Sequence, residues 1–140
     1  HLVDNGIVRF MQKLGTGYTN YFNQKNERVG SLFQGRFKAV LVSTEKHFRY
    51  MPLYIHLNPL DLIAPEWREK KLNNLNKAID FLESYRWSSY LDYIGKKNFP
   101  LVTQRGYLLE ISGGLKNFKK YTNDFMATMD LGEIQDLTLE

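Results

Sequence analysis

Hydrophobic residues near the start of the chain recur every three to four positions, which is the spacing of one face of an amphipathic helix. The residues that follow this pattern are Ile7, Phe10, Met11, Leu14, Tyr18, Tyr21 and Phe22. Asp4 or Asn5 can cap the start of this helix by accepting a hydrogen bond from a free backbone N–H. The polar residues 23–30 end the pattern, so we expect one helix before them.

The period changes from about four to two in residues 31–42, which read SLFQGRFKAVLV. Alternation of this kind predicts a β-strand with one buried face and one basic face, and the basic face carries Arg36 and Lys38. A single strand leaves its backbone N–H and C=O groups unpaired. We therefore expect it to pair with strands upstream of residue 1 or with a second copy of the chain.

The remaining pattern is again helical and begins after Ser43 and Thr44, either of which can act as an N-cap. Pro52 interrupts the first of these helices, so we expect the helix to kink there or to restart with Pro52 in its first turn. Asn58-Pro59 closes it. Further helices are predicted over residues 74–85, 87–94, 104–111 and 115–126, with Gly113-Gly114 as a helix stop. The expected fold class is α+β and mainly helical.

The composition limits the class of protein. The chain has 140 residues, 43% of them hydrophobic, and no cysteine. This length suits one ordinary domain, and the absence of cysteine excludes a disulfide framework, a thiolate zinc site and a cysteine nucleophile. No apolar stretch approaches the roughly 18 residues of a membrane helix, and no signal peptide opens the chain. We therefore expect no membrane partner and, by default, a cytoplasmic location.

The net charge of +4 is distributed unevenly along the chain. The last twenty residues hold five acidic residues and no basic one, so the first 120 residues form a basic, aromatic-rich body. Such a body can attract a polyanion such as nucleic acid. The alternative is a soluble surface that is simply rich in lysine.

Residues 53–60, LYIHLNPL, hold the best candidates for chemistry. Tyr54 and Asn58 are four positions apart, which places them on one face of a helix. A tyrosine hydroxyl can attack a phosphoryl group that a divalent metal polarises, and an asparagine carbonyl is an acceptable ligand for Mg²⁺ or Mn²⁺. The alternative is a core tyrosine followed by an asparagine that ends the helix. The three histidines show no HxH or HExxH spacing.

Three blocks of sequence together resemble the REP-associated tyrosine transposases, which are single-tyrosine enzymes of the HUH group that process single-stranded DNA. The blocks are GYTNYFNQKNERVGSLFQGRFKAVLV from Gly17, YIHLNP from Tyr54 and WSSY from Trp87. The resemblance covers about residues 5–125. The combination is specific, whereas any one block alone is a weak signal.

This resemblance implies a ferredoxin-like HUH core with an appended helical region. Residues 1–60 would be part of the catalytic core, residues 61–129 the helical region and residues 130–140 an acidic tail. Tyr54 would attack a DNA phosphate and form a 5′-phosphotyrosine link. Asn58 would be the third ligand of Mg²⁺ or Mn²⁺, beside two histidines on a strand. Members of the family commonly act as homodimers on hairpin-forming DNA.

The resemblance also implies positions for DNA contacts. Arg36 and Lys38 fall where the DNA backbone would be gripped, and Trp87 and Tyr90 are candidates for stacking on bases. The alternatives are an exposed strand face for the first pair and core packing for the second, because aromatic residues spaced i, i+3 often face a core.

Two features depart from the family pattern. The His-hydrophobic-His motif belongs a few residues before the first helix, and residues 1–3, His-Leu-Val, do not supply it. We therefore expect this chain not to cleave DNA by itself. Pro52 lies two residues before the expected nucleophile, where it can re-aim the tyrosine or mark a copy that has lost its activity.

Two rival functions come from other classes: a non-catalytic module that binds nucleic acid, and a helical protein-interaction domain.

The salt dependence of DNA binding tests the protein-interaction domain. For a protein that binds DNA, the logarithm of the affinity falls with the logarithm of the salt concentration, because bound phosphates release counterions. We expect such a negative slope when a fluorescent oligonucleotide is titrated at several salt concentrations. A slope near zero would support the interaction domain instead.

Overall fold

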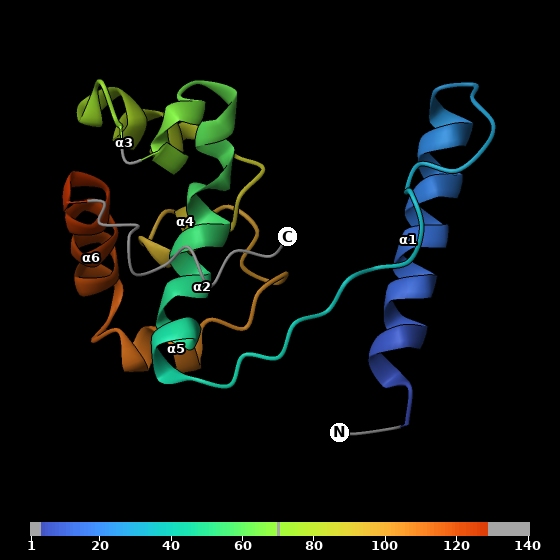
Figure 1. Cartoon of the computed structure of the whole chain (residues 1–140), viewed down its shortest axis with the longest axis horizontal. Helices are drawn as coiled ribbons and strands as arrows, with labels where there is room; N and C mark the ends of the chain where they lie inside the picture. The colour runs from blue at the N-terminus through green and yellow to red at the C-terminus, as the bar shows by residue number, and fades with distance from the viewer. Residues whose placement is uncertain (1–3, 70, 129–140) are drawn as a thin grey trace. The chain divides into compact units, whose positions relative to one another are not determined.

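The computed structural model describes residues 4–69 and 71–128, and it is mainly helical, as predicted (Figure 1). The α-helices of the described residues are α1 (Gly6–Lys25), α2 (Glu45–Leu57), α3 (Leu75–Ser84), α4 (Tyr90–Tyr93), α5 (Gly106–Ile111) and α6 (Leu115–Thr128). Two 3₁₀ helices, η1 (Asn58–Leu62) and η2 (Pro65–Glu69), lie between α2 and α3. In the described ranges, no helix has the length and apolar character needed to cross a membrane. The chain divides into two compact units, His1–Leu41 and Val42–Glu140.

The first unit consists of α1 and the segment that follows it. The predicted helix is confirmed, and Asn5 stands at its N-cap position without making a side-chain capping bond. Gly30 has a φ of +96°, a left-handed conformation that suits glycine, and its carbonyl accepts a hydrogen bond from Asn23 Nδ2 at 2.8 Å. The ring of Phe33 then lies 6.3 Å from that of Tyr18. No residue of α1 is buried.

The prediction of a strand over residues 31–42 is wrong. This segment has no regular secondary structure, and the described residues contain no strand at all. The physical reason is that a strand needs a neighbour to pair its backbone groups, and no other described segment offers one. Arg36 and Lys38 are exposed, but they do not form one face of a strand.

The compact units also differ from the expected division of the chain. The expected boundary lay after residue 60, whereas the structure separates the units after Leu41. The reason is that Leu57 and Leu60 belong to the same core as the later helices, so α2 and η1 join the second unit. The predicted acidic tail, residues 130–140, lies outside the described residues.

Helix α2 is continuous through Pro52. Its N-cap is Thr44, whose hydroxyl accepts a hydrogen bond from the backbone N–H of His47 at 3.1 Å. Pro52 removes one intrahelical donor, but the helix does not restart there and ends at Leu57. The prediction that a new helix could start at Pro52 is therefore wrong. Tyr54 lies on the helix that Thr44 caps.

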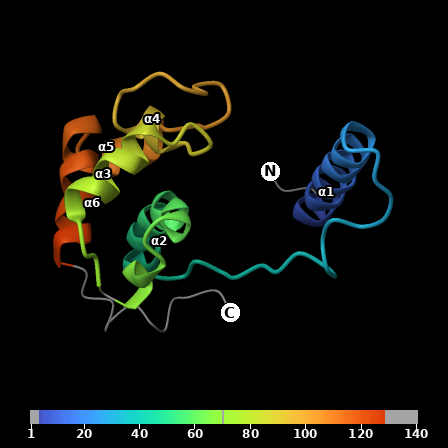
Figure 2. The same ribbon diagram turned by 90° about the horizontal axis from the view of Figure 1, so that it is seen from above.

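The core of the second unit lies among α2, the two 3₁₀ helices, α3, α4 and α6 (Figures 1 and 2), and α3 contacts both α4 and α6. Asn74 caps α3 by accepting a hydrogen bond from the backbone N–H of Lys77 at 2.9 Å. The glycine pair before α6 confirms the predicted helix stop, since both residues have positive φ. The buried core residues are Leu57, Leu60, Trp67, Ala78, Leu82, Tyr90, Tyr93, Phe118 and Met126.

Replacing Leu57 tests the importance of this core. Leu57 is 0% exposed, so Leu57→Ala removes buried methyl groups and leaves a cavity. We expect the free energy of unfolding to fall by about 2–5 kcal/mol, measured by urea denaturation followed by circular dichroism. Leu62→Ala is the matched control, because Leu62 is mostly exposed and its replacement should change stability by less than about 0.5 kcal/mol. Equal losses in the two variants would contradict this core.

Candidate active site

Tyr54 and Asn58 lie one helical turn apart, where α2 passes into η1. The backbone N–H of Asn58 donates to the carbonyl of Tyr54, so the helical geometry that sets their spacing extends to Asn58. Both side chains are partly buried. The structure thus brings together the two residues that the sequence singled out.

A third side chain, Arg68 of η2, joins this pair. Its Nη2 donates a hydrogen bond to Asn58 Oδ1 at 2.8 Å, and its Nη1 lies 3.4 Å from Tyr54 Oη. The guanidinium carbon also lies 5.3 Å from the centre of the Tyr54 ring and 4.7 Å from that of Trp67. A positive charge is therefore held directly beside the tyrosine hydroxyl.

Asp61 fixes the position of Arg68. The Arg68 guanidinium donates to Asp61 Oδ1 at 3.0 Å and to Oδ2 at 2.7 Å, and Trp67 Nε1 donates to Oδ1 at 2.6 Å. Partial burial opposes ionisation of Asp61, but the hydrogen bonds from Arg68 and Trp67 and the Arg68 charge outweigh it and lower the pKa of Asp61. The hydrogen bond to Asp61 also raises the pKa of Arg68.

The residues around Tyr54 do not by themselves fit a divalent metal ion. Asn58 Oδ1 and both oxygens of Asp61, the hard donors nearest to Tyr54 in sequence, already accept hydrogen bonds from the Arg68 guanidinium. A metal ion bound there would displace that cation or be repelled by it. Among the described residues, no three His, Cys, Asp or Glu side chains are grouped to hold a metal. The role of Asn58 as a metal ligand stays a prediction.

Sequence reasoning missed Arg68 and Asp61. Asp61 carried a weak signal, because it follows Asn58 by three residues, and three-residue spacing aligns side chains on a 3₁₀ helix. Arg68 carried none. It lies ten residues beyond Asn58, and only the turn between η1 and η2 returns it to α2.

His56 links the YIHLNP block to the WSSY block. Its Nε2 lies 2.9 Å from Ser89 Oγ, and its ring packs 4.8 Å from the ring of Tyr93 and 5.6 Å from that of Phe118. Nδ1 is buried without a hydrogen-bond partner. We therefore assign the proton of the neutral ring to Nε2, donating to Ser89, because a proton on Nδ1 would lack an acceptor. Burial lowers the pKa of His56 to about 4.

The aromatic pair predicted to stack on DNA bases has two different environments. Tyr90 is 0% exposed and its ring lies 5.7 Å from that of His56, so the expectation that it stacks on a base is wrong because core residues cover it. Trp87 is 72% exposed and remains accessible. Arg36 and Lys38 belong to the other compact unit.

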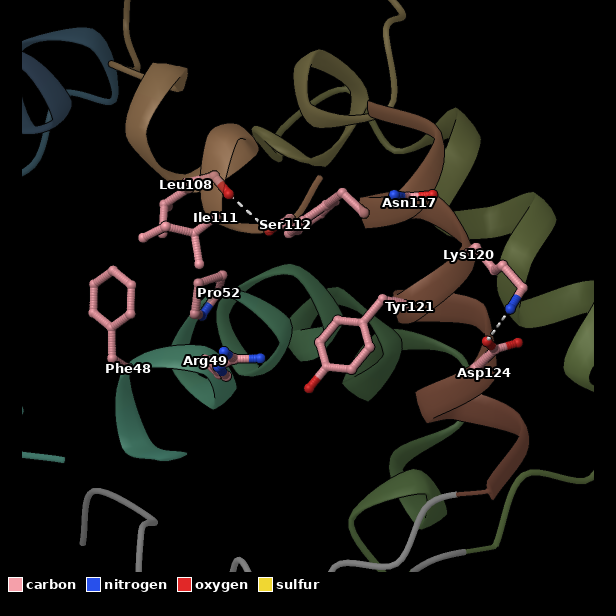
Figure 3. A pocket seen from close by; sticks show the side chains of 11 residues that line it. Phe48, Arg49, Pro52, Leu108, Ile111, Ser112, Asn117, Lys120, Tyr121 and Asp124 are labelled. Atoms are coloured by element: carbon pink, nitrogen blue, oxygen red, sulfur yellow. Dashed lines mark hydrogen bonds and ion pairs between the residues drawn. The ribbon is translucent and has the colours of Figure 1, made fainter. Parts of the chain in front are cut away.

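A separate hollow of about 310 Å³ lies among α2, α5 and α6 (Figure 3). Phe48 and Pro52 of α2 face Leu108 and Ile111 of α5 across it, and α6 closes the other side. Tyr54 does not line this hollow. Pro52 therefore contributes to an apolar wall, and the polar cluster around Arg68 is a distinct site.

Comparisons with models of known protein families, with curated proteins and with solved structures find no match to this chain. They add nothing for or against the resemblance to single-tyrosine transposases. The chemistry of this site therefore has to be argued from the geometry of Tyr54, Asn58, Asp61 and Arg68.

The buried His56 makes stability depend on pH. Its pKa of about 4 is below the ordinary value of 6.5, so the folded state prefers the neutral ring. This preference is fully present above pH 6.5 and is lost as the pH falls from 6.5 towards 4. We expect the native state to lose about 3 kcal/mol over that range, measured by urea unfolding. In His56→Gln, the free energy of unfolding should change little with pH above 4.5, because the titration of carboxyl groups contributes little to it there. An unchanged curve would contradict the burial of a neutral ring.

Proposed function

We propose that this chain belongs to an enzyme that cleaves and rejoins single-stranded or hairpin DNA, with Tyr54 as the nucleophile. The observation that carries the proposal is the Arg68 guanidinium beside the Tyr54 hydroxyl, 3.4 Å away and held there by Asp61. Guanidinium groups bind phosphate oxygens through paired N–H donors. A DNA phosphate that reaches Arg68 would therefore have the tyrosine oxygen next to it.

Each side chain has a role in such a reaction. Tyr54 Oη attacks the phosphorus atom, the bond to the 3′ oxygen breaks, and the tyrosine proton passes through solvent to that departing oxygen. The product is a 5′-phosphotyrosine and a free 3′-hydroxyl, and rejoining reverses the step. Arg68 offsets the negative charge that builds on the phosphate oxygens, and Asp61 and Asn58 orient the guanidinium.

Mg²⁺ or Mn²⁺ is the cofactor that the resemblance implies, with the two histidines of the family's His-hydrophobic-His motif as its other ligands. The roles given above to Tyr54, Arg68, Asp61 and Asn58 include no metal ion, since the Asn58 carbonyl is held by Arg68. Assays with and without Mn²⁺ are therefore part of the test. A homodimer is likewise proposed on the resemblance alone.

A second candidate function is a module that binds nucleic acid without catalysis. The observation that favours it is that Arg68 already donates hydrogen bonds to Asp61, Asn58 and Tyr54. In such a module the hydrogen bonds of Arg68 would only hold η2 against α2, and Tyr54 would be an ordinary partly buried tyrosine.

Replacement of Tyr54 separates the two candidates. The full-length protein is incubated with labelled hairpin DNA and Mn²⁺, and the products are separated on a denaturing gel. We expect a band of protein joined to DNA that is absent with Tyr54→Phe, and parallel reactions with and without Mn²⁺ show whether a metal ion takes part. Tyr50→Phe is the matched control, because Tyr50 lies one turn earlier on the same helix and is buried.

The same gel identifies the outcomes that would contradict the proposal. No adduct from the unmodified protein, with DNA binding intact, favours the non-catalytic module. An adduct that persists in Tyr54→Phe places the nucleophile elsewhere.

Arg68 provides a second test of the active-site geometry. Arg68→Lys keeps the positive charge but loses the planar set of donors that reaches Tyr54, Asn58 and Asp61 at once. We expect adduct formation to slow by about 10²-fold or more, the usual effect of losing one preorganised donor to a transition state. Arg49→Lys is the control, since Arg49 pairs with Glu45 one turn earlier on α2 and its side chain is 58% exposed. Equal rates in the two variants would remove Arg68 from the reaction.

A further inference from the structure

An exposed aromatic stack lies on the second unit, formed by Arg86, Trp87 and Phe99. The rings of Trp87 and Phe99 are nearly parallel, with an interplanar angle of 21° and centres 6.3 Å apart. The Arg86 guanidinium lies 4.8 Å from the centre of the Trp87 ring and 5.5 Å from that of Phe99. We call these three residues the Trp87 platform. With these contacts made, Trp87 is still 72% exposed.

Hydrogen bonds from within the fold hold the platform in place. The carboxylate of the buried Asp92 accepts from the backbone N–H of Asn98 at 3.0 Å and from that of Phe99 at 2.9 Å. The Asn98 amide in turn donates to the carbonyl of Arg86 at 2.7 Å and to that of Ser88 at 3.1 Å. The loop that carries Phe99 is thereby fastened to the segment that carries Trp87, so the stack is preorganised.

The segment that carries the platform has an excess of positive charge. Residues 84–105 contain four basic residues, namely Arg86, Lys96, Lys97 and Arg105, and one acidic residue, Asp92. Asp92 is buried and occupied by backbone N–H groups. Glu83, just before this segment, pairs with Lys96 at 2.9 Å, so the excess positive charge is carried by Arg86, Lys97 and Arg105. An exposed aromatic surface of positive sign attracts a polyanion that carries aromatic rings.

We propose that the Trp87 platform binds an unpaired base of single-stranded DNA by stacking. The exposed surface of the indole offers the base an aromatic partner, and Arg86 adds a cation that can reach the adjacent phosphate. A paired base in a duplex is stacked on its neighbours and cannot lie on the indole. The inference rests on the proposed function for its choice of DNA, but it does not require Tyr54 to be a nucleophile.

The charge around the platform favours DNA over a protein partner. Exposed tryptophan and arginine are also common at protein–protein contacts. A protein partner, however, needs no excess of positive charge beside the aromatic rings, whereas a DNA strand carries one negative charge per nucleotide. A surface for a protein partner would instead leave the DNA affinity unchanged in Trp87→Ala.

The two tryptophans make the test direct. Trp67 is 1% exposed and Trp87 is 72% exposed, so a base can reach Trp87 alone. The 140-residue chain is titrated at low salt with oligothymidine while the tryptophan emission is recorded. We expect single-stranded oligothymidine to quench the emission, because stacked bases quench indole fluorescence, and a duplex of the same length to quench it far less.

Three variants show whether stacking produces the signal, with affinity measured from the anisotropy of a fluorescein-labelled oligothymidine. Trp87→Ala should weaken binding about tenfold or more, and Trp87→Phe should keep most of the affinity while losing the quenching. Leu101→Ala is the matched control, since Leu101 is fully exposed in the following loop and is not aromatic. Urea unfolding of each variant checks that the fold is retained, as expected for exposed positions.

Several outcomes would overturn the platform. One is an unchanged DNA affinity in Trp87→Ala, as a surface for a protein partner would give. Another is an equal loss of DNA affinity in Leu101→Ala. The others are equal quenching by duplex and single-stranded DNA, and no DNA binding by the unmodified chain. Its failure is also distinguishable from failure of the proposed function. A covalent adduct without quenching contradicts the platform alone, whereas quenching without an adduct contradicts the role of Tyr54 alone.

Discussion

Burial of one face of α2 is the constraint on which the rest of the second unit depends. Leu53, His56 and Leu57 of this helix are buried, and His56 bonds to Ser89 in the segment before α4. A helix held along one face has a fixed rotation about its axis. Tyr54 is therefore held at the edge of that face, and Asn58 follows one turn later. The inward residues thus position the side chains that carry the proposed chemistry.

The same packing connects the two surfaces to which we assign function. Ser89, which contacts His56, lies two residues after Trp87, and the Asn98 amide bonds to Ser88 between them. His56 stands on the helix that carries Tyr54 of the Arg68 cluster, and its partner Ser89 stands on the segment that carries the Trp87 platform. A change that loosens His56 would therefore disturb both.

Local patterns predicted local features, and features that depend on distant partners were missed. Helices α3 and α6 follow from the helical pattern of their own residues, and the end of the helix before α6 follows from Gly113-Gly114. The pairing of Tyr54 with Asn58 follows from one helical turn. The strand over residues 31–42 failed because alternation specifies a strand only when a neighbour pairs with it. Arg68 was not predictable, because two 3₁₀ turns bring it back to α2. Spacing alone also could not separate the exposed Trp87 from the buried Tyr90.

The shared use of Arg68 has a consequence for the energetics of its neighbours. Tyr54, Asn58 and Asp61 all contact one guanidinium, so the removal of any one of them changes the environment of the other two. Their contributions to stability are therefore coupled rather than additive. In a double-mutant cycle, the loss of Asn58 would cost less once Asp61 had already been removed, because the guanidinium would no longer be held in place. The change in stability on replacing one side chain of this cluster therefore depends on which of the others are present.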